Sequence, residues 1–108
     1  MSHATSWAFL ITAGFLEIAF AIGLKSANGL QRPWILGGTL AALLGSLYLL
    51  TLALRHLPVG TAYATWTGIG AVGTALIGII WLGDSASIGR LSCMGLIMAG
   101  VAGLRWIP

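Results

Sequence analysis

Apolar and polar residues divide the chain into four long apolar runs. The runs cover residues 4–24, 33–54, 58–82 and 87–106. Gly, Asn and Asp occur in the polar segments between them, and Pro33 and Pro58 begin the second and third runs. A helix needs about 20 apolar residues to cross the hydrocarbon core of a bilayer. The runs are rich in Leu and Ala and lack the strict alternation of a barrel strand. The pattern therefore predicts four membrane-spanning helices, joined by short loops, in one transmembrane domain over residues 1–108.

Charged residues are nearly absent from these runs. Glu17 is the one charge in the first run, and Arg90 and Arg105 lie near the ends of the fourth, where they can extend to the membrane surfaces. The chain is 58% hydrophobic and 6% charged, whereas soluble proteins carry about 25% charged residues. Because the first run lacks an N-terminal Lys or Arg, we expect it to be retained as a helix of an integral membrane protein, not cleaved as a signal peptide.

Four helices of this size leave little interior in which one chain could shield Glu17 from lipid, so we expect self-association. Gly95, Ala99 and Gly103 recur every four residues in the fourth run. Such a stripe of small residues lets two helices approach closely in lipid, and it is the predicted dimer face. The alternative is that Gly and Ala are simply common in this chain, and that the stripe has no special role.

Lys and Arg are almost balanced between the two sides of the membrane. With four spans, Arg55 and Arg105 share one side with both termini, and the opposite side carries Lys25, Arg32 and Arg90. Orientation follows an excess of Lys and Arg on the cytoplasmic side, and the excess here is weak. The balance permits insertion in both orientations, which would let two opposite copies pair as an antiparallel homodimer. A weak bias that still selects one orientation is the alternative.

Gly68, Gly70 and Gly73 match the G-x-G-x-x-G pattern of dinucleotide sites. The match lies inside the third apolar run, and Asp84 is too near to be the acidic partner expected about 20 residues further on. We therefore exclude nucleotide binding and expect these glycines to form a hinge in the helix. We also expect no nucleic-acid partner.

Glu17 is the only acidic residue within any run. A charge at mid-membrane costs about 2.5–3.5 kcal/mol on insertion scales, and it usually marks a transport pathway or a proton relay. A carboxylate there can hold a proton or a cation but not both at once, which is the chemical basis of proton-coupled cation exchange. With no acid pair, no Ser–His–Asp arrangement and no cluster with metal-ligand spacing, we expect no enzyme activity, no cofactor and no metal.

Three polar side chains of other runs could join Glu17 if their helix faces meet. Tyr63 and Trp66 are three residues apart and so share a face. They lie roughly 9 to 12 Å into the third run, which is too deep for an interfacial belt of aromatic residues. Ser46 lies well inside the second run, and Gly14 leaves space one turn before the carboxylate. For Trp7, Trp34 and Trp106 we expect the interfacial role.

At these residues the chain resembles the small multidrug resistance family. The resemblance rests on "AGFLEIAFAIGLKSANG" at 13–29, "LPVGTAYATWTGIGAVGTALIGII" at 57–80 and "LGDSASIGRL" at 82–91. The third run and the "GD" loop are similar to the guanidinium exporter subtype. The resemblance implies an all-α bundle of four transmembrane helices, which forms an antiparallel dual-topology homodimer in the bacterial inner membrane and exports guanidinium in exchange for protons.

The resemblance also implies roles for single residues. Glu17 would bind substrate and protons, Gly14 would leave room beside it, and three side chains would orient the carboxylate by hydrogen bonds: Ser46, Tyr63 and Trp66. Phe20 stands where the subtype often has Trp, and it lacks an N–H donor. Two other functions stay open, namely export of quaternary ammonium or lipophilic cations, and a non-transporting membrane subunit in which Glu17 pairs with a partner chain.

Overall fold

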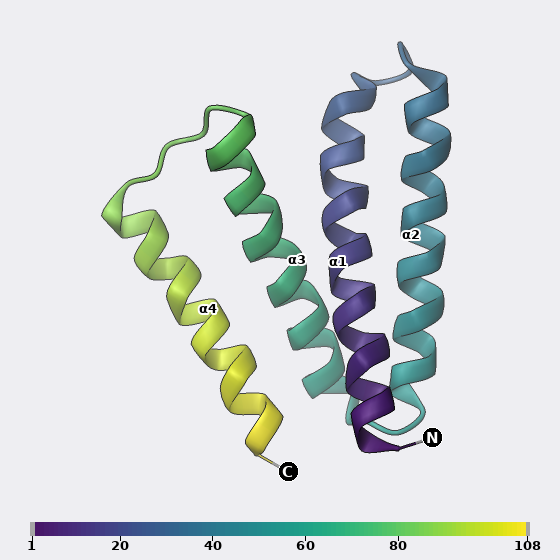
Figure 1. The fold of residues 1–108 in the computed structure, drawn as a ribbon, viewed down its shortest axis with the longest axis vertical. Helices are drawn as coiled ribbons and strands as arrows, with labels where there is room; N and C mark the ends of the chain where they lie inside the picture. Colours follow the sequence, from purple (N-terminus) through teal and green to yellow (C-terminus); the bar gives the residue numbers. More distant parts are fainter. Residues whose placement is uncertain (1, 108) are drawn as a thin grey trace.

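The computed structural model describes residues 2–107 as four helices in a row (Figure 1). They are α1 (His3–Ala27), α2 (Pro33–Leu54), α3 (Val59–Trp81) and α4 (Ile88–Trp106). Each is long and apolar enough to cross a membrane, and the described residues contain no strand. The all-α prediction of four membrane-spanning helices is therefore confirmed.

Local sequence signals explain where the helices begin and end. The hydroxyl of Ser2 accepts a hydrogen bond from the amide of Thr5 and so caps α1. The hydroxyl of Ser87 caps α4 in the same way, by accepting from the amide of Arg90. α1 continues to Ala27, three residues beyond the predicted 24, because Lys25 and Ser26 remain helical. It ends at Asn28, which adopts a left-handed backbone conformation with a φ of 51°.

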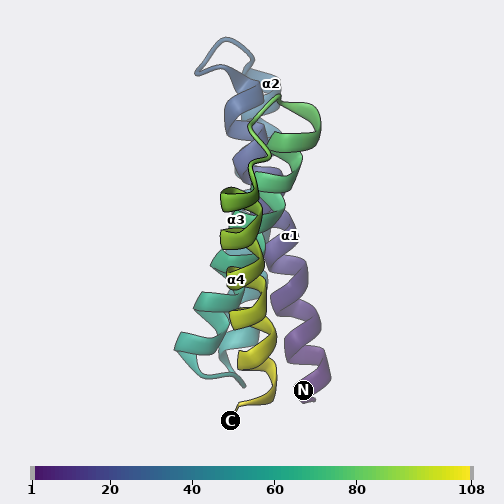
Figure 2. The ribbon, with the colours of Figure 1, turned by 90° about the vertical axis from the view of Figure 1, so that its left-hand side faces the viewer.

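The helices form an open layer in place of a closed bundle. α1 lies between α2 and α3, and α4 packs along α3 at the edge of the layer (Figure 1). The layer measures 43 × 35 × 16 Å, and Figure 2 shows it edge-on. Both termini and the α2–α3 turn lie at one end of the molecule, and the α1–α2 and α3–α4 connections lie at the other. One chain thus buries little of α4, in which only Met94 is buried.

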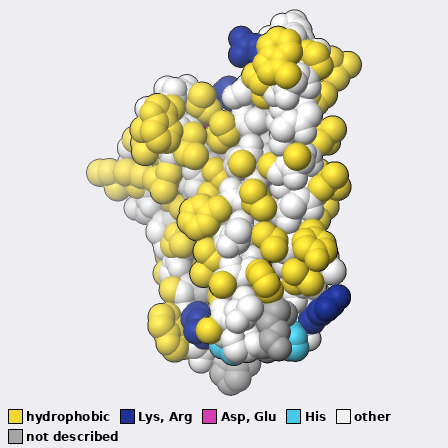
Figure 3. All heavy atoms as spheres, turned by 45° about the vertical axis from the view of Figure 1, so that its right-hand side comes forward, with side chains coloured by type: hydrophobic (Ala, Val, Ile, Leu, Met, Phe, Trp, Pro, Cys, Tyr) yellow, Lys and Arg dark blue, Asp and Glu magenta, His cyan; other side chains and the backbone are white. Residues whose placement is uncertain are grey.

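The buried core lies where α1, α2 and α3 meet, toward the end that carries the termini. It is a cluster of apolar side chains: Trp7, Leu10, Ala13, Leu50, Ala53, Leu57, Ala62 and Trp66. On the face shown in Figure 3, apolar side chains cover the middle of the molecule, while Lys, Arg and His lie toward its two ends. This distribution is the one that a membrane-spanning protein requires.

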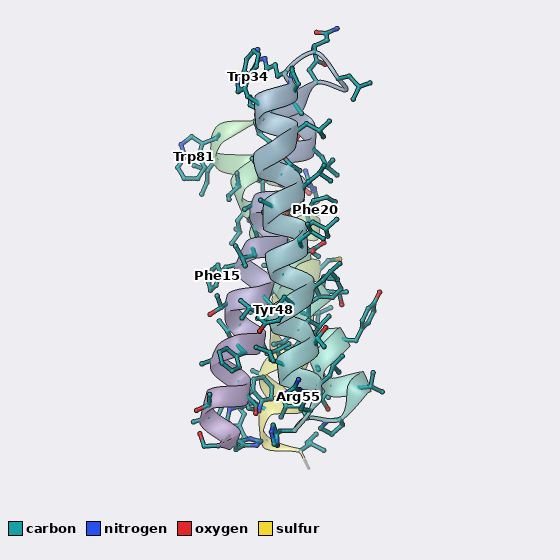
Figure 4. All side chains as sticks on the ribbon, turned by 90° about the vertical axis from the view of Figure 1, so that its right-hand side faces the viewer. Phe15, Phe20, Trp34, Tyr48, Arg55 and Trp81 are labelled. Carbon is teal, nitrogen blue, oxygen red and sulfur yellow. The ribbon has the colours of Figure 1, made fainter. Side chains whose placement is uncertain are left out.

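The expected belt of tryptophans is present in part. Trp34 and Trp106 are 73% and 78% exposed, and Figure 4 shows Trp34 at the end of the molecule opposite Arg55. Trp7 is only 6% exposed and so does not form part of an exposed belt, although it lies at the end of the molecule that holds both termini. The guanidinium of Arg105 lies 5.1 Å from the centroid of the Trp7 ring and covers it.

Candidate functional site

Glu17 lies in the middle of α1, on the side that faces α3. Its side chain is partly buried, and its Oε2 atom is buried without a hydrogen-bond partner among residues 2–107. The carboxylate lines an open groove of about 420 Å³ between α1, α3 and the connection to α4. The groove is lined by Glu17, Ala21, Thr67, Gly70, Ala71, Thr74, Ala75 and Asp84. An unpaired acceptor in a groove of small side chains can bind a small cation or a proton.

Glycines let α1 and α3 approach closely at this groove. A Cβ added to Gly70 would lie 2.7 Å from Cγ of Glu17, and one added to Gly14 would lie 2.8 Å from Cγ2 of Ile69. Side chains cannot pack at such distances, so both positions need a residue without a Cβ. The space expected at Gly14 is thus filled by Ile69 of α3 and is not open beside the carboxylate.

The three glycines predicted to form a hinge lie within an unbroken helix, because α3 runs from Val59 to Trp81. Each of them receives a neighbouring side chain. Gly68 accommodates Val101 of α4, and Gly70 and Gly73 accommodate Glu17 and Ile18 of α1. In this conformation they are packing positions that set the distances from α3 to its two neighbours.

A buried chain of hydrogen bonds joins α1, α2 and α3 close to Glu17. The indole N–H of Trp66 donates to the hydroxyl of Ser46 at 2.8 Å, and this hydroxyl donates to the carbonyl of Ala13 at 2.7 Å. Ser46 is fully buried and Trp66 is 8% exposed. Ala13 lies one helical turn before Glu17, so the chain of bonds fixes the backbone that carries the carboxylate.

The structure brings the predicted polar residues together only in part. The ring of Tyr63 lies 5.6 Å from that of Trp66, at an interplanar angle of 56°. Tyr63 is 57% exposed, and its hydroxyl has no hydrogen bond to the other described residues. No hydrogen bond joins Glu17 to Ser46 or Trp66 within residues 2–107. Phe20 is partly buried, is absent from the lining of the groove, and points away from Phe15 across α1 (Figure 4).

Sequence reasoning missed Asp84 and two threonines of the groove. Asp84 follows Gly83, whose φ of 78° turns the chain back toward α3. The amide of Asp84 donates to the carbonyl of Gly78 at 3.0 Å, and its carboxylate lies against Gly78, where a Cβ would not fit. Because this turn comes after the apolar run, no helical periodicity places Asp84 near Glu17.

The predicted dimer face lies on the outer side of α4. A Cβ added to Gly95 or Gly103 would have no other heavy atom within 4 Å, and Ala99 is exposed. Cys93 is exposed on the same helix. α4 therefore presents a row of small residues that no other part of residues 2–107 covers.

Known proteins are similar to this chain over most of its length. The family described as "Small Multidrug Resistance protein" matches residues 5–97. The "Guanidinium exporter" of Yersinia pseudotuberculosis serotype I (strain IP32953) is 53% identical over 102 residues, which cover 93% of this chain and 96% of that protein. The "Guanidinium exporter" of Citrobacter freundii is 55% identical over 102 residues, which cover 93% of this chain and 95% of that protein.

The match and the four apolar helices agree with each other. Together they identify the chain as a multi-pass protein of the bacterial inner membrane that belongs to a family of transporters. By its sequence and by its fold, the chain belongs to the small multidrug resistance family.

Proposed function

We propose that the protein exports guanidinium in exchange for protons and that it does so as an antiparallel homodimer, in which two Glu17 side chains share one binding site. The observation that carries the proposal is the buried Oε2 of Glu17, an acceptor without a partner among the described residues, at a groove open to the surface. The relatives named "Guanidinium exporter" support the choice of cation.

The chemistry of the groove suits guanidinium. This ion is planar, and its N–H donors form a fork that matches the two oxygens of a carboxylate. The hydroxyl of Thr67 donates to the carbonyl of Tyr63 at 2.8 Å, so its lone pairs are free to accept an N–H from the ion. A proton on Glu17 removes the negative charge and one acceptor. Binding of a proton and binding of guanidinium therefore exclude each other, which couples export to proton entry.

The open layer of helices supports a dimer. One chain leaves the groove of Glu17 open to its surroundings and leaves the small residues of α4 uncovered. In lipid, an open groove with a carboxylate carries a large free-energy cost. A second copy packed in the opposite orientation would enclose both Glu17 side chains in one polar cavity. We expect like-charge repulsion to make the two titrate as a coupled pair.

The test is guanidinium-driven proton flux into liposomes that contain the purified protein. A guanidinium gradient should drive flux in the original protein, and Glu17→Gln should abolish it while the protein still elutes as a dimer. Gln is nearly isosteric with Glu but cannot ionise, so the variant removes the charge with little change in packing. Vigorous guanidinium-driven flux in Glu17→Gln would contradict the proposal.

Export of quaternary ammonium ions is the second candidate function. The sequence at Phe20 favours it, although Phe20 does not line the groove of one chain. Phe stands where the resemblance implies Trp, and a ring without an N–H donor suits an apolar cation better than guanidinium. This reading predicts proton flux driven by tetrapropylammonium, and competition between that ion and guanidinium. If tetrapropylammonium neither drives flux nor slows guanidinium, the second candidate fails and the first stands alone.

A further inference from the structure

A second cavity, apart from the Glu17 groove, lies at the end of the molecule that holds both termini and the α2–α3 turn (Figure 1). Its volume is about 420 Å³. The polar and aromatic side chains in its wall are His3, Trp7, His56, Thr61, Arg105 and Trp106. No Asp or Glu lies among its lining residues within 2–107. A cavity with a guanidinium, two imidazoles and no acid is electrostatically suited to an anion.

Arg105 is held in place at the wall of this cavity. Its Nη1 donates to Nε2 of His3 at 3.0 Å, and its guanidinium stacks over Trp7 at 5.1 Å from the ring centroid. These two contacts use one of the five N–H donors of the guanidinium. The remaining donors stay in a fixed plane, and such a fork matches the oxygens of a phosphate group.

The beginning of α3 borders the same cavity. Pro58 is the N-cap residue, so no side chain accepts a hydrogen bond there, and the first turn contains no acidic residue. The first amides of a helix have no acceptor within the helix, and together they carry a partial positive charge that favours anions. Thr61, in that first turn, and Pro58 both line the cavity.

Trp7 supplies an independent sign that an acceptor is missing. Its side chain is 6% exposed and lines the cavity, yet its Nε1–H has no acceptor among residues 2–107. Buried N–H donors in proteins nearly always have a partner. The wall of this cavity thus combines a guanidinium fork, the side chain of Trp7 and an uncapped helix N-terminus, and no acid among residues 2–107 lines it.

We propose that this cavity binds a phosphate group, either the phosphodiester of an anionic phospholipid or free inorganic phosphate. The cavity lies at the helix ends, beside Trp106, which is 78% exposed. Membrane proteins place such exposed tryptophans at the level of the lipid headgroups. Basic residues at this level attract anionic lipids from the surrounding leaflet. The proposal does not depend on the transported cation.

The test is native mass spectrometry of the purified full-length protein with added phosphatidylglycerol or phosphatidylcholine. We expect one tightly retained phosphatidylglycerol per chain and weaker retention of the zwitterionic lipid. Arg105→Gln should weaken retention of phosphatidylglycerol about tenfold or more. Arg55→Gln is the matched control, because Arg55 lies at the same end of the molecule (Figure 4) but does not line the cavity. It should leave retention almost unchanged.

Two further arms complete the experiment. Millimolar inorganic phosphate that displaces the lipid would show that the cavity accepts free phosphate, and failure to displace it would assign the cavity to the lipid headgroup alone. If Arg105→Gln does not elute as the original protein does, His56→Gln removes a second cavity residue without touching the His3 contact. Equal retention of both lipids, or equal effects of the cavity variants and Arg55→Gln, would overturn the proposal.

Discussion

Trp66 of α3 donates its indole N–H to the hydroxyl of Ser46 of α2 at 2.8 Å, inside the apolar core of the molecule. Ser46 in turn donates its own O–H to the carbonyl of Ala13 in α1. One hydroxyl therefore acts as both acceptor and donor and ties three helices together. Since Ala13 lies one turn from Glu17, this linkage connects core packing to the position of the candidate binding carboxylate.

Ser46→Ala should destabilise the protein and weaken transport together. The variant removes the acceptor of the Trp66 N–H and leaves that donor buried without a partner, at a cost of about 1–3 kcal/mol. Thermal unfolding in detergent and guanidinium-driven flux measure the two effects. Ser92→Ala, at an exposed position on α4, is the control. Equal behaviour of the two variants would mean that the hydrogen bond contributes nothing.

Gly70→Ala should disturb the groove directly. The added methyl would lie 2.7 Å from Cγ of Glu17, so either the carboxylate or the α1–α3 spacing must shift. Overpacking of this kind costs about 1–3 kcal/mol, and we expect most of the guanidinium flux to be lost. Gly60→Ala is the control on the same helix, because a Cβ there meets no other heavy atom within 4 Å. Gly60→Ala should keep its guanidinium flux. An equal loss of flux in both variants would mean that transport depends on helix flexibility and not on the contact between Gly70 and Glu17.

The sequence predicted the four helices because apolar runs of membrane length have few other solutions. It also placed Ser46 and Trp66 among the polar side chains that could meet at Glu17 if their helix faces meet. Polar groups deep in an apolar run must find partners on neighbouring helices, since lipid offers none. Depth and polarity therefore indicate that Ser46 and Trp66 need partners, whereas only the packing of the helices shows that they bond to each other.

Other features of the site could not be predicted, because helices that are apolar on all sides do not reveal which face packs against which neighbour. Trp7 has the sequence position of an interfacial residue, but it is buried under Arg105 from the other end of the chain. Asp84 reaches the groove through a turn at Gly83, and loop conformation leaves no periodic signal. In a sequence, the glycines of α3 suggest a flexible helix. The packed structure shows instead that each of Gly68, Gly70 and Gly73 makes room for a side chain of a neighbouring helix.

Acidification should weaken guanidinium binding. A proton neutralises Glu17 and so removes the charge that holds the cation, which means that affinity rises with pH and falls as pH is lowered. Where the protonated form dominates, each competing proton should change the apparent affinity by up to about tenfold per pH unit. Titration of binding by calorimetry between about pH 6 and 9, a range that brackets neutral pH, measures this slope. A pH-independent affinity would argue against competition at one carboxylate.

Gly95→Leu should weaken the dimer without affecting the fold of one chain. In the single chain a Cβ at Gly95 meets no other heavy atom within 4 Å, so a larger side chain has room there. If the stripe of Gly95, Ala99 and Gly103 packs against a second copy, a leucine must push the two helices apart. We expect the dissociation constant to rise at least about tenfold, which corresponds to about 1.4 kcal/mol.

Gly100→Leu is the matched control for this experiment. Gly100 is also exposed on α4 with open space at its Cβ position, but it lies off the stripe. Both variants add the same side chain to the same helix, so any effect on helix propensity or insertion is shared. Sedimentation in detergent that separates only Gly95→Leu from the original protein would locate the interface on the stripe. Dissociation by both variants would move the contact to a broader face of α4, and dissociation by neither would place the dimer contact on another helix.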